Sequence, residues 1–261
     1  MATLVVPFKF YHLSQKPQIQ TINNKHRIFR LSAQSPETIQ STVDPISRVE
    51  YTPGPFDHVF LDIFRNKMVQ EVGWDSEKPG YDGLIDVANR LMVAGTNSET
   101  KEAAVRILRS LFPPLLLELY KILVAPIAQG KLAAVMVARV TALSCQWLMG
   151  TCTVNDVELP GGSSLPSGVF VERCKYLEES KCVGICVNTC KLPTQAFFMD
   201  HMGVPLLMEP NFNDYSCQFK FGVSPPEEDS TLKEPCLERC PNTIRRRTSA
   251  TVTVEMKCPK A

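Results

Sequence analysis

The first 36 residues contain no aspartate or glutamate, although they include five basic residues. Residues 37–261 hold the other 23 of the 28 basic residues and all 27 acidic ones, so this larger part is slightly acidic. An acid-free N-terminus with many Ser, Thr, Asn and Gln residues, and without the apolar stretch of a secretory signal, is typical of organelle transit peptides. The sequence therefore predicts a transit peptide over residues 1–36, with a disordered tail as the alternative.

No uninterrupted apolar stretch reaches the roughly 18 residues of a membrane span. Residues 115–149 come closest, but Glu118, Lys121, Lys131 and Arg139 interrupt them. We therefore expect a soluble or peripheral protein without a spanning helix. The net charge of +1 gives no indication of a nucleic-acid partner, and we expect none.

Several common catalytic motifs are also missing: the sequence has no G-x-S-x-G, P-loop, G-x-G-x-x-G or H-E-x-x-H. Only four histidines occur, and His12 and His26 lie in the expected transit peptide. His58 begins an amphipathic stretch, where a surface role is the simpler interpretation. His201 is a weak candidate for proton transfer or metal binding, because a lone histidine near a helix end is more often structural.

Cysteine, in contrast, is abundant, and seven of the ten cysteines fall between residues 174 and 240. Without a secretion signal, free thiols or metal thiolates are expected rather than disulfides. Cys182, Cys186 and Cys190 recur at every fourth residue, so an α-helix through them would place three thiols on one face. Such a face suits a soft metal, although the spacing matches neither zinc ribbons nor ferredoxins. Ordinary core packing of free cysteines is the alternative.

Hydrophobic periodicity predicts a helix-rich α+β fold. A proline-rich linker (37–56) precedes a helical region (57–150), which we expect to pack as one unit with a cysteine-rich region of short strands (151–242), before a flexible tail (243–261). Asp57 and Ser98 are expected to begin helices, and Pro126 to break the apolar helices of residues 114–149. Strands are expected at residues 151–159, 169–171, 206–208 and 216–221.

The cysteine-rich region carries a long distinctive motif. It reads Cys182-Val-Gly-Ile-Cys186-Val-Asn-Thr-Cys190-Lys-Leu-Pro-Thr-Gln195-Ala-Phe-Phe198, followed by Asp200-His-Met-Gly-Val204, Met208-Glu-Pro-Asn-Phe-Asn-Asp-Tyr-Ser-Cys217-Gln-Phe-Lys-Phe-Gly222 and Pro235-Cys236-Leu-Glu-Arg-Cys240. Over about residues 174–240 the chain resembles the plastid β-carotene isomerases of strigolactone biosynthesis. The resemblance extends more loosely upstream, through Phe56-Asp57-His58.

This resemblance implies a chloroplast isomerase that interconverts all-trans-β-carotene and 9-cis-β-carotene, the first step toward carlactone and the strigolactones. It also implies iron, mononuclear or in an iron–sulfur cluster. We expect the ligands to lie among six cysteines, with Cys174 in reserve: Cys182, Cys186, Cys190, Cys217, Cys236 and Cys240. Plastid carotenoid cleavage enzymes would act downstream. The alternatives are an iron–sulfur electron-transfer protein and a zinc-stapled interaction protein of the plastid.

β-Carotene is a hydrocarbon without a polar group, so shape and apolar burial must hold it. The helices of residues 84–149, with Phe112 and Trp147, are therefore expected to form the walls of its site. Because such a substrate resides in membranes, peripheral contact with a plastid membrane is also expected.

Overall fold

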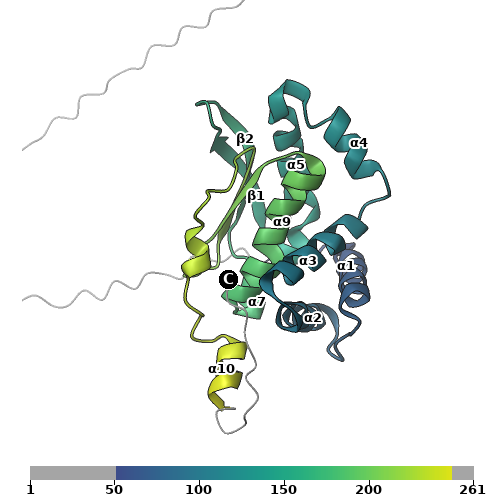
Figure 1. Ribbon diagram of the computed structural model, residues 1–261, viewed down its shortest axis with the longest axis vertical. Helices are drawn as coiled ribbons and strands as arrows, with labels where there is room; N and C mark the ends of the chain where they lie inside the picture. Colours follow the sequence, from purple (N-terminus) through teal and green to yellow (C-terminus); the bar gives the residue numbers. More distant parts are fainter. Residues whose placement is uncertain (1–50, 249–261) are drawn as a thin grey trace, which may run out of the picture. The chain divides into compact units, whose positions relative to one another are not determined.

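The computed structural model describes residues 51–248. The expected transit peptide and most of the expected linker lie outside the described residues. The helices are α1 (Asp57–Val72), α2 (Gly80–Ala94), α3 (Asn97–Ser110), α4 (Leu116–Leu123), η1 (Ile127–Gly130), α5 (Lys131–Ser144), α6 (Gln146–Met149), α7 (Lys175–Ser180), α8 (Val183–Ile185), η2 (Cys186–Lys191), α9 (Leu192–Phe197), η3 (Phe198–Met202), η4 (Ser230–Lys233) and α10 (Pro241–Thr248). The strands are β1 (Cys152–Glu158), β2 (Ser164–Val171), β3 (Leu206–Pro210) and β4 (Cys217–Phe221). The expected helix-rich α+β fold is confirmed (Figure 1).

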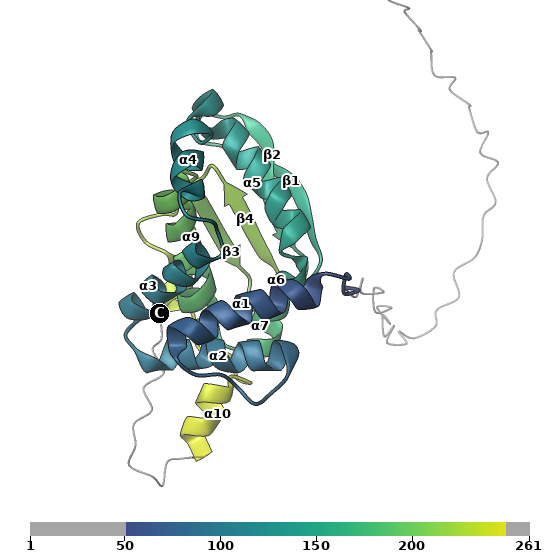
Figure 2. The ribbon, with the colours of Figure 1, turned by 90° about the vertical axis from the view of Figure 1, so that its right-hand side faces the viewer.

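The four strands form one antiparallel sheet in the order β1-β2-β4-β3. All four expected strands are present, and β2 is longer than residues 169–171. Buried and partly exposed residues alternate along β4, because successive side chains point to opposite faces of a strand. Val169, Val171 and Phe219 are at most 4% exposed and belong to the buried face. Helix α5 packs against β2, β1 and β4 (Figure 2).

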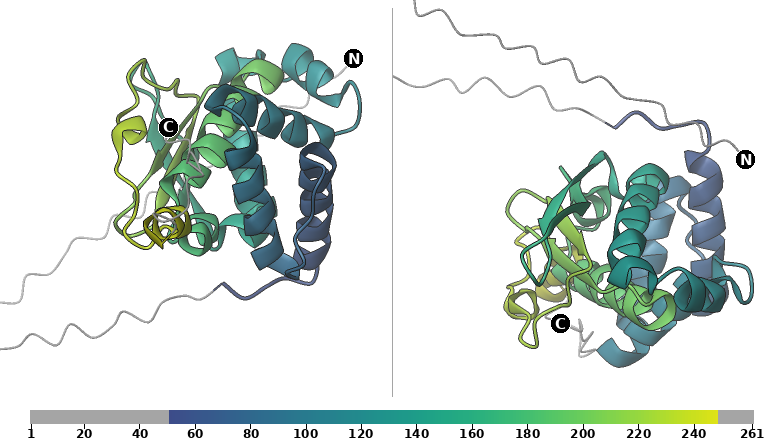
Figure 3. Two further views of the ribbon diagram at one scale, coloured as in Figure 1. Left: turned by 60° about the horizontal axis from the view of Figure 1, so that its bottom comes forward. Right: turned by 90° about the horizontal axis from the view of Figure 1, so that it is seen from above.

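A continuous helical stretch from α8 to η3 connects the sheet with the N-terminal helices. It contacts α3 through α9 and η2, and it contacts β3 through α9. Figure 3 shows this stretch in green, between the sheet and the blue helices α1–α3. The backbone N–H of Met208 donates to the Gln195 side chain at 2.8 Å, which joins α9 to β3 directly.

The cysteine segment is not the regular α-helix that its spacing predicts. Cys182 precedes the helix in an extended conformation, and residues 186–191 form the π-helix η2. This π-helix ends just before Leu192 and Pro193, whose ring and missing N–H conflict with an uninterrupted α-helical hydrogen-bond ladder. The helix continues past Pro193, and Cys182 precedes it instead of sharing one helical face with Cys186 and Cys190.

Helix α1 begins at Asp57 as expected, whereas α3 begins at Asn97, one residue before Ser98. Asp57 does not cap α1; its carboxylate accepts hydrogen bonds from the Tyr51 hydroxyl and the Gly54 N–H of the preceding turn. Thr96 caps α3 instead of Ser98, because Thr96 and Glu99 form a reciprocal capping box. At the other end, residues 243–248 belong to α10 rather than to an irregular tail. Residues 249–261 lie outside the described part.

Candidate active site

An apolar cavity of about 80 Å³ lies between the N-terminal helices and the buried face of the sheet. Its walls come from α1, α2, α3, α6, α7, η2, α9, β3 and β4, so nearly every layer of the described fold contributes. Phe64, Ile107, Leu148 and Phe219 are among the lining residues. A cavity of this size holds a few water molecules or a small apolar group, and it must widen to admit anything larger.

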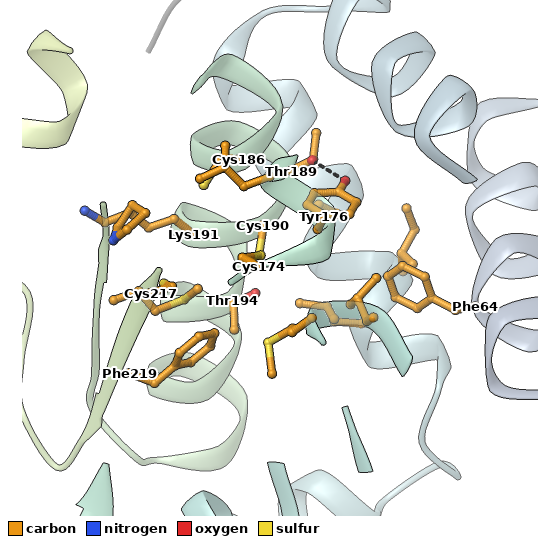
Figure 4. A pocket seen from close by; sticks show the side chains of 18 of the residues that line it. Phe64, Cys174, Tyr176, Cys186, Thr189, Cys190, Lys191, Thr194, Cys217 and Phe219 are labelled. Carbon is orange, nitrogen blue, oxygen red and sulfur yellow. Dashed lines mark hydrogen bonds between the residues drawn. The ribbon is translucent and has the colours of Figure 1, made fainter. Parts of the chain in front are cut away.

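Four thiols line this cavity, and they come from three separate segments (Figure 4). Cys186 and Cys190 lie on η2, and Cys217 is the first residue of β4. Cys174 precedes α7, where its backbone N–H donates to the Tyr215 carbonyl at 2.7 Å. The fold therefore brings these four cysteines to one cavity although their segments are separate in the sequence. Cys174, expected only as a reserve ligand, belongs to this group.

Burial keeps these four thiols protonated. It raises the pKa of Cys190 to about 12 and raises the pKa of Cys174, Cys186 and Cys217 as well, because the apolar surroundings disfavour a thiolate. The neighbouring thiols raise the pKa values of Cys186 and Cys217 further. At neutral pH the cavity thus presents four neutral, polarisable S–H groups.

Alkylation should distinguish these thiols from Cys236, which is only partly buried. With iodoacetamide at mildly alkaline pH, we expect Cys174, Cys186 and Cys217 to react more slowly than Cys236, because burial shields these three sulfur atoms and disfavours their reactive thiolate form. Peptide mapping by mass spectrometry over time measures this order. Equal rates for Cys217 and Cys236 in the folded protein would contradict the described burial; unfolding in urea, which should equalise all rates, is the control.

Tyr176 and Thr189 form a polar pair in the otherwise apolar wall (Figure 4). The Thr189 hydroxyl donates to the Ile185 carbonyl at 2.7 Å, so the Tyr176 hydroxyl donates to Thr189 Oγ1 at 2.7 Å. Burial raises the pKa of Tyr176 far above its usual value, so the phenol stays neutral. The pair fixes α7 against η2 and leaves no charge facing the cavity.

Lys191 lines the cavity with a side chain that is only 2% exposed. Its ammonium group lies 2.6 Å from Asp229 Oδ2 and donates to Thr231 Oγ1 at 2.7 Å. The charge is thus neutralised by the loop before η4, and this ion pair joins that loop to η2. Sequence reasoning missed the pair, because Glu227-Glu228-Asp229 reads as an exposed acidic loop and only Asp229 turns inward.

The structure separates the other predicted site residues from this cavity. Cys182 and Cys240 are buried but do not line it, and Asn242 Nδ2 lies 3.9 Å from Cys182 Sγ. Cys236 is partly buried in the segment before α10. His201 lies on η3 beside Phe197, at 6.1 Å between ring centroids, and also stays outside the cavity.

The expected walls are partly wrong. Trp147 does not line the cavity but packs against Phe60 and Phe64, and Phe112 stacks on Phe197 outside it. Helices α2, α3 and α6 do supply lining residues, as expected for residues 84–149.

The chemistry of the cysteine side chains favours a metal ion, but their geometry does not. Four cysteines around one cavity are the soft ligands that iron or zinc prefers. Between residues 51 and 248, however, no three His, Cys, Asp or Glu side chains converge closely enough to hold a metal ion. As arranged here the residues do not form a metal site, and we derive no chemical step through iron.

The fold and the cavity define a helix-rich α+β protein with a buried, thiol-lined apolar site. Residues 147–230 match the family model "Beta-carotene isomerase D27-like, C-terminal". The chain is 38% identical over 170 residues to "Beta-carotene isomerase D27, chloroplastic" of Arabidopsis thaliana, which covers 63% of this chain and 62% of that protein. It is 33% identical over 195 residues to the Medicago truncatula protein of the same name, covering 73% of this chain and 75% of that protein. No solved structure is significantly similar.

The chain therefore belongs to the D27-like β-carotene isomerase family, and the predicted family is confirmed. Both relatives are named isomerases and labelled chloroplastic, in agreement with the predicted enzyme class and plastid localisation. The matched segment contains all four cavity thiols together with Lys191 and Asp229, whereas Cys236 and Cys240 lie beyond it.

Proposed function

We propose that this protein is a plastid carotenoid isomerase that interconverts all-trans-β-carotene and 9-cis-β-carotene. The observation that carries the proposal is the coincidence of two independent features. The segment shared with the isomerase family is the segment that supplies most of an apolar cavity with no uncompensated charge. A hydrocarbon substrate requires such walls, since only apolar burial and shape can hold it.

The whole substrate is far larger than a cavity of about 80 Å³. We propose that the cavity receives the segment of the polyene around the reacting double bond after the lining side chains move apart. Rotation about that bond requires its bond order to fall transiently. A dry, apolar enclosure would protect the reactive state of the polyene from water, and the neutral thiols and the Tyr176 phenol would add no charge that disturbs it.

Within strigolactone biosynthesis, we propose that the chain performs the first step, upstream of the plastid carotenoid cleavage enzymes. Iron dependence stays a prediction with a separate test. Metal analysis of the purified full chain, and of a Cys186→Ser/Cys190→Ser/Cys217→Ser variant, would decide it. A Cys145→Ser/Cys152→Ser variant is the matched control, because these two cysteines are neither expected ligands nor part of the cavity wall. Full activity in an iron-free preparation would contradict the prediction.

The function itself is tested by incubating the full chain with all-trans-β-carotene in detergent micelles and separating the cis isomers by chromatography. We expect 9-cis-β-carotene to form, and the same mixture to arise from 9-cis-β-carotene, because an isomerase accelerates both directions. Heat-denatured protein is the control. Visible absorption of an iron–sulfur cluster without any isomerisation would favour the electron-transfer alternative instead.

A further inference from the structure

Helices α4 and α5 expose large apolar side chains to solvent instead of burying them. We call this set the apolar face, and each member is at least 43% exposed: Leu115, Leu116, Leu119, Ile122, Leu123, Ile127, Leu132, Met136, Val140 and Leu143. These residues occupy one stretch of chain, through α4, η1 and α5. A soluble protein rarely leaves so many neighbouring apolar side chains exposed unless the surface binds something.

The pattern along each helix shows that this face is not an incompletely packed core. In α5, Leu132, Met136, Val140 and Leu143 recur at intervals of three or four and share one side of the helix. The opposite side, with Ala134 and Ala138, is buried as α5 packs on the sheet. Helix α5 therefore satisfies its contacts to the fold with small residues and directs its large ones outward.

Helix α4 likewise directs most of its large apolar side chains to solvent. Its exposed residues Leu116, Leu119 and Leu123 share one side, whereas Leu117 is buried. Lys121, on the side of Leu117, donates from Nζ to the Asp200 carbonyl at 2.6 Å, which fixes α4 to η3. The Tyr120 hydroxyl of α4 donates to the Ala133 carbonyl of α5 at 3.5 Å, and η1 connects the two helices in sequence, so α4 and α5 lie close together (Figure 2).

Basic residues accompany the apolar face. Between residues 115 and 144 the chain has Lys121, Lys131 and Arg139 but a single acidic residue, Glu118. Arg109 and Leu115 together line an open hollow of about 300 Å³ at the start of α4. A net positive, apolar surface complements anionic lipid headgroups above hydrocarbon tails. Two copies of the same surface would instead bring like charges together, which argues against a second copy as the occupant.

The length of α5 shows whether this helix could cross a bilayer or only lie on its surface. One described helical segment, residues 127–144, is long and apolar enough by composition alone to cross a membrane. This differs from the expectation from sequence, which found no such stretch. However, Ala128 and Gln129 have positive φ angles, so the regular helix is only α5, with 14 residues. Such a helix spans about 21 Å, less than the roughly 30 Å hydrocarbon core.

We propose that the apolar face docks this protein onto a bilayer containing anionic lipid, with α4 and α5 lying in the interfacial layer. The proposal rests on the proposed function in one respect: docking would hold the protein at the membrane in which a hydrocarbon substrate resides. The aliphatic side chains enter the acyl region, and the long Lys131 and Arg139 side chains reach the headgroups.

Vesicle sedimentation of the full chain tests the docking. The vesicles are phosphatidylcholine alone, or equal parts of phosphatidylcholine and phosphatidylglycerol. We expect the wild type to bind the anionic vesicles more strongly, and added salt to weaken that binding. Ile122→Glu/Leu143→Glu, at positions 69% and 81% exposed, should lower the bound fraction at least tenfold. Val154→Glu/Leu232→Glu places the same charges elsewhere and should bind like the wild type. Circular dichroism checks that both variants fold.

Activity separates this proposal from the proposed function. The Ile122→Glu/Leu143→Glu variant should isomerise β-carotene in detergent micelles like the wild type but lose activity at least tenfold on vesicle-held substrate. Absence of isomerisation in every preparation would contradict the proposed function and leave the vesicle-binding result to decide the docking. Unchanged vesicle binding by this variant would overturn the proposal. So would a wild-type dimer, seen by light scattering without vesicle binding, that the variant dissociates.

Discussion

Replacement of Lys191 by methionine is expected to lower the free energy of unfolding by about 3–5 kcal/mol, because removing one partner of a buried ion pair leaves the other charge uncompensated. The Lys191 side chain is 2% exposed and that of Asp229 is 12% exposed. Asp229 Oδ2 has no other polar partner among residues 51–248. Chemical denaturation near neutral pH measures the loss.

Two variants control this prediction. Lys191→Met/Asp229→Leu removes both charges and should recover most of the stability, since an apolar replacement of a buried ion pair is often close to neutral. Lys233→Met breaks the pair with Glu228, in which the side chains are 79% and 90% exposed. It should cost no more than about 1 kcal/mol. Equal losses in Lys191→Met and Lys233→Met would show that the buried pair has no special role.

The loss should also depend on pH. Burial alone would raise the pKa of Asp229, but the hydrogen bonds from Lys191 and Thr231 outweigh it and lower the pKa. The pair therefore stabilises the wild type fully above the unfolded carboxyl pKa of about 3.9, and this contribution is lost as pH falls through the lower folded pKa. In Lys191→Met the hydrogen bonds from Thr231 remain but the ion pair is lost, so burial of the carboxylate is less well compensated and acid should favour the variant's neutral carboxyl. The stability difference should shrink toward acidic pH.

Replacement of Ala104 by leucine is expected to reduce isomerisation at least tenfold while changing the free energy of unfolding by no more than about 2 kcal/mol. Ala104 lines the cavity and is 4% exposed, so three added carbons enter a space of about 80 Å³. Filling a cavity returns lost contacts, at about 24 cal/mol per Å³, and this gain offsets any local overpacking. The leucine side chain would occupy the space that the substrate needs, so isomerisation should fall. Denaturation and the micellar assay give the two readouts.

The neighbouring Ala103 supplies the control. It lies on the same helix and is 7% exposed, but it does not line the cavity. Ala103→Leu should therefore overpack the core and lower stability by about 1–3 kcal/mol, while the folded fraction keeps its specific activity. Full activity in Ala104→Leu would show that the substrate does not use this cavity.

Local sequence patterns predicted most of the elements, because helix and strand periodicity depend on neighbouring residues. The strand at residues 216–221 was predicted from its residue pattern, and the structure shows the alternation of buried and partly exposed residues along it. The π-helix at residues 186–191 did not follow, since four-residue spacing is read as an α-helix by default. Four-residue spacing likewise placed Cys182 on one face with Cys186 and Cys190, although Cys182 precedes the helix in an extended conformation.

Long-range pairs could not be predicted in the same way. Lys191 and Asp229 lie far apart in sequence, and nothing in an acidic loop indicates which of its carboxylates turns inward. The apolar faces of residues 115–144 pose a related problem. Amphipathic spacing shows that a helix has two sides, but only packing shows which side meets the core. Here the large residues face outward, opposite to the expectation that they form walls of the substrate site.

Composition, periodicity and the long motif are local properties, and they were enough to predict the helix-rich α+β class and the isomerase family. Only the tertiary structure decided which thiols share a cavity, that a buried ion pair neutralises Lys191, and that α4 and α5 present an apolar face. Each of these depends on where distant segments meet and on which side of a helix remains in solvent. The seven cysteines between residues 174 and 240 thus divide into four that line the cavity and three that lie outside it.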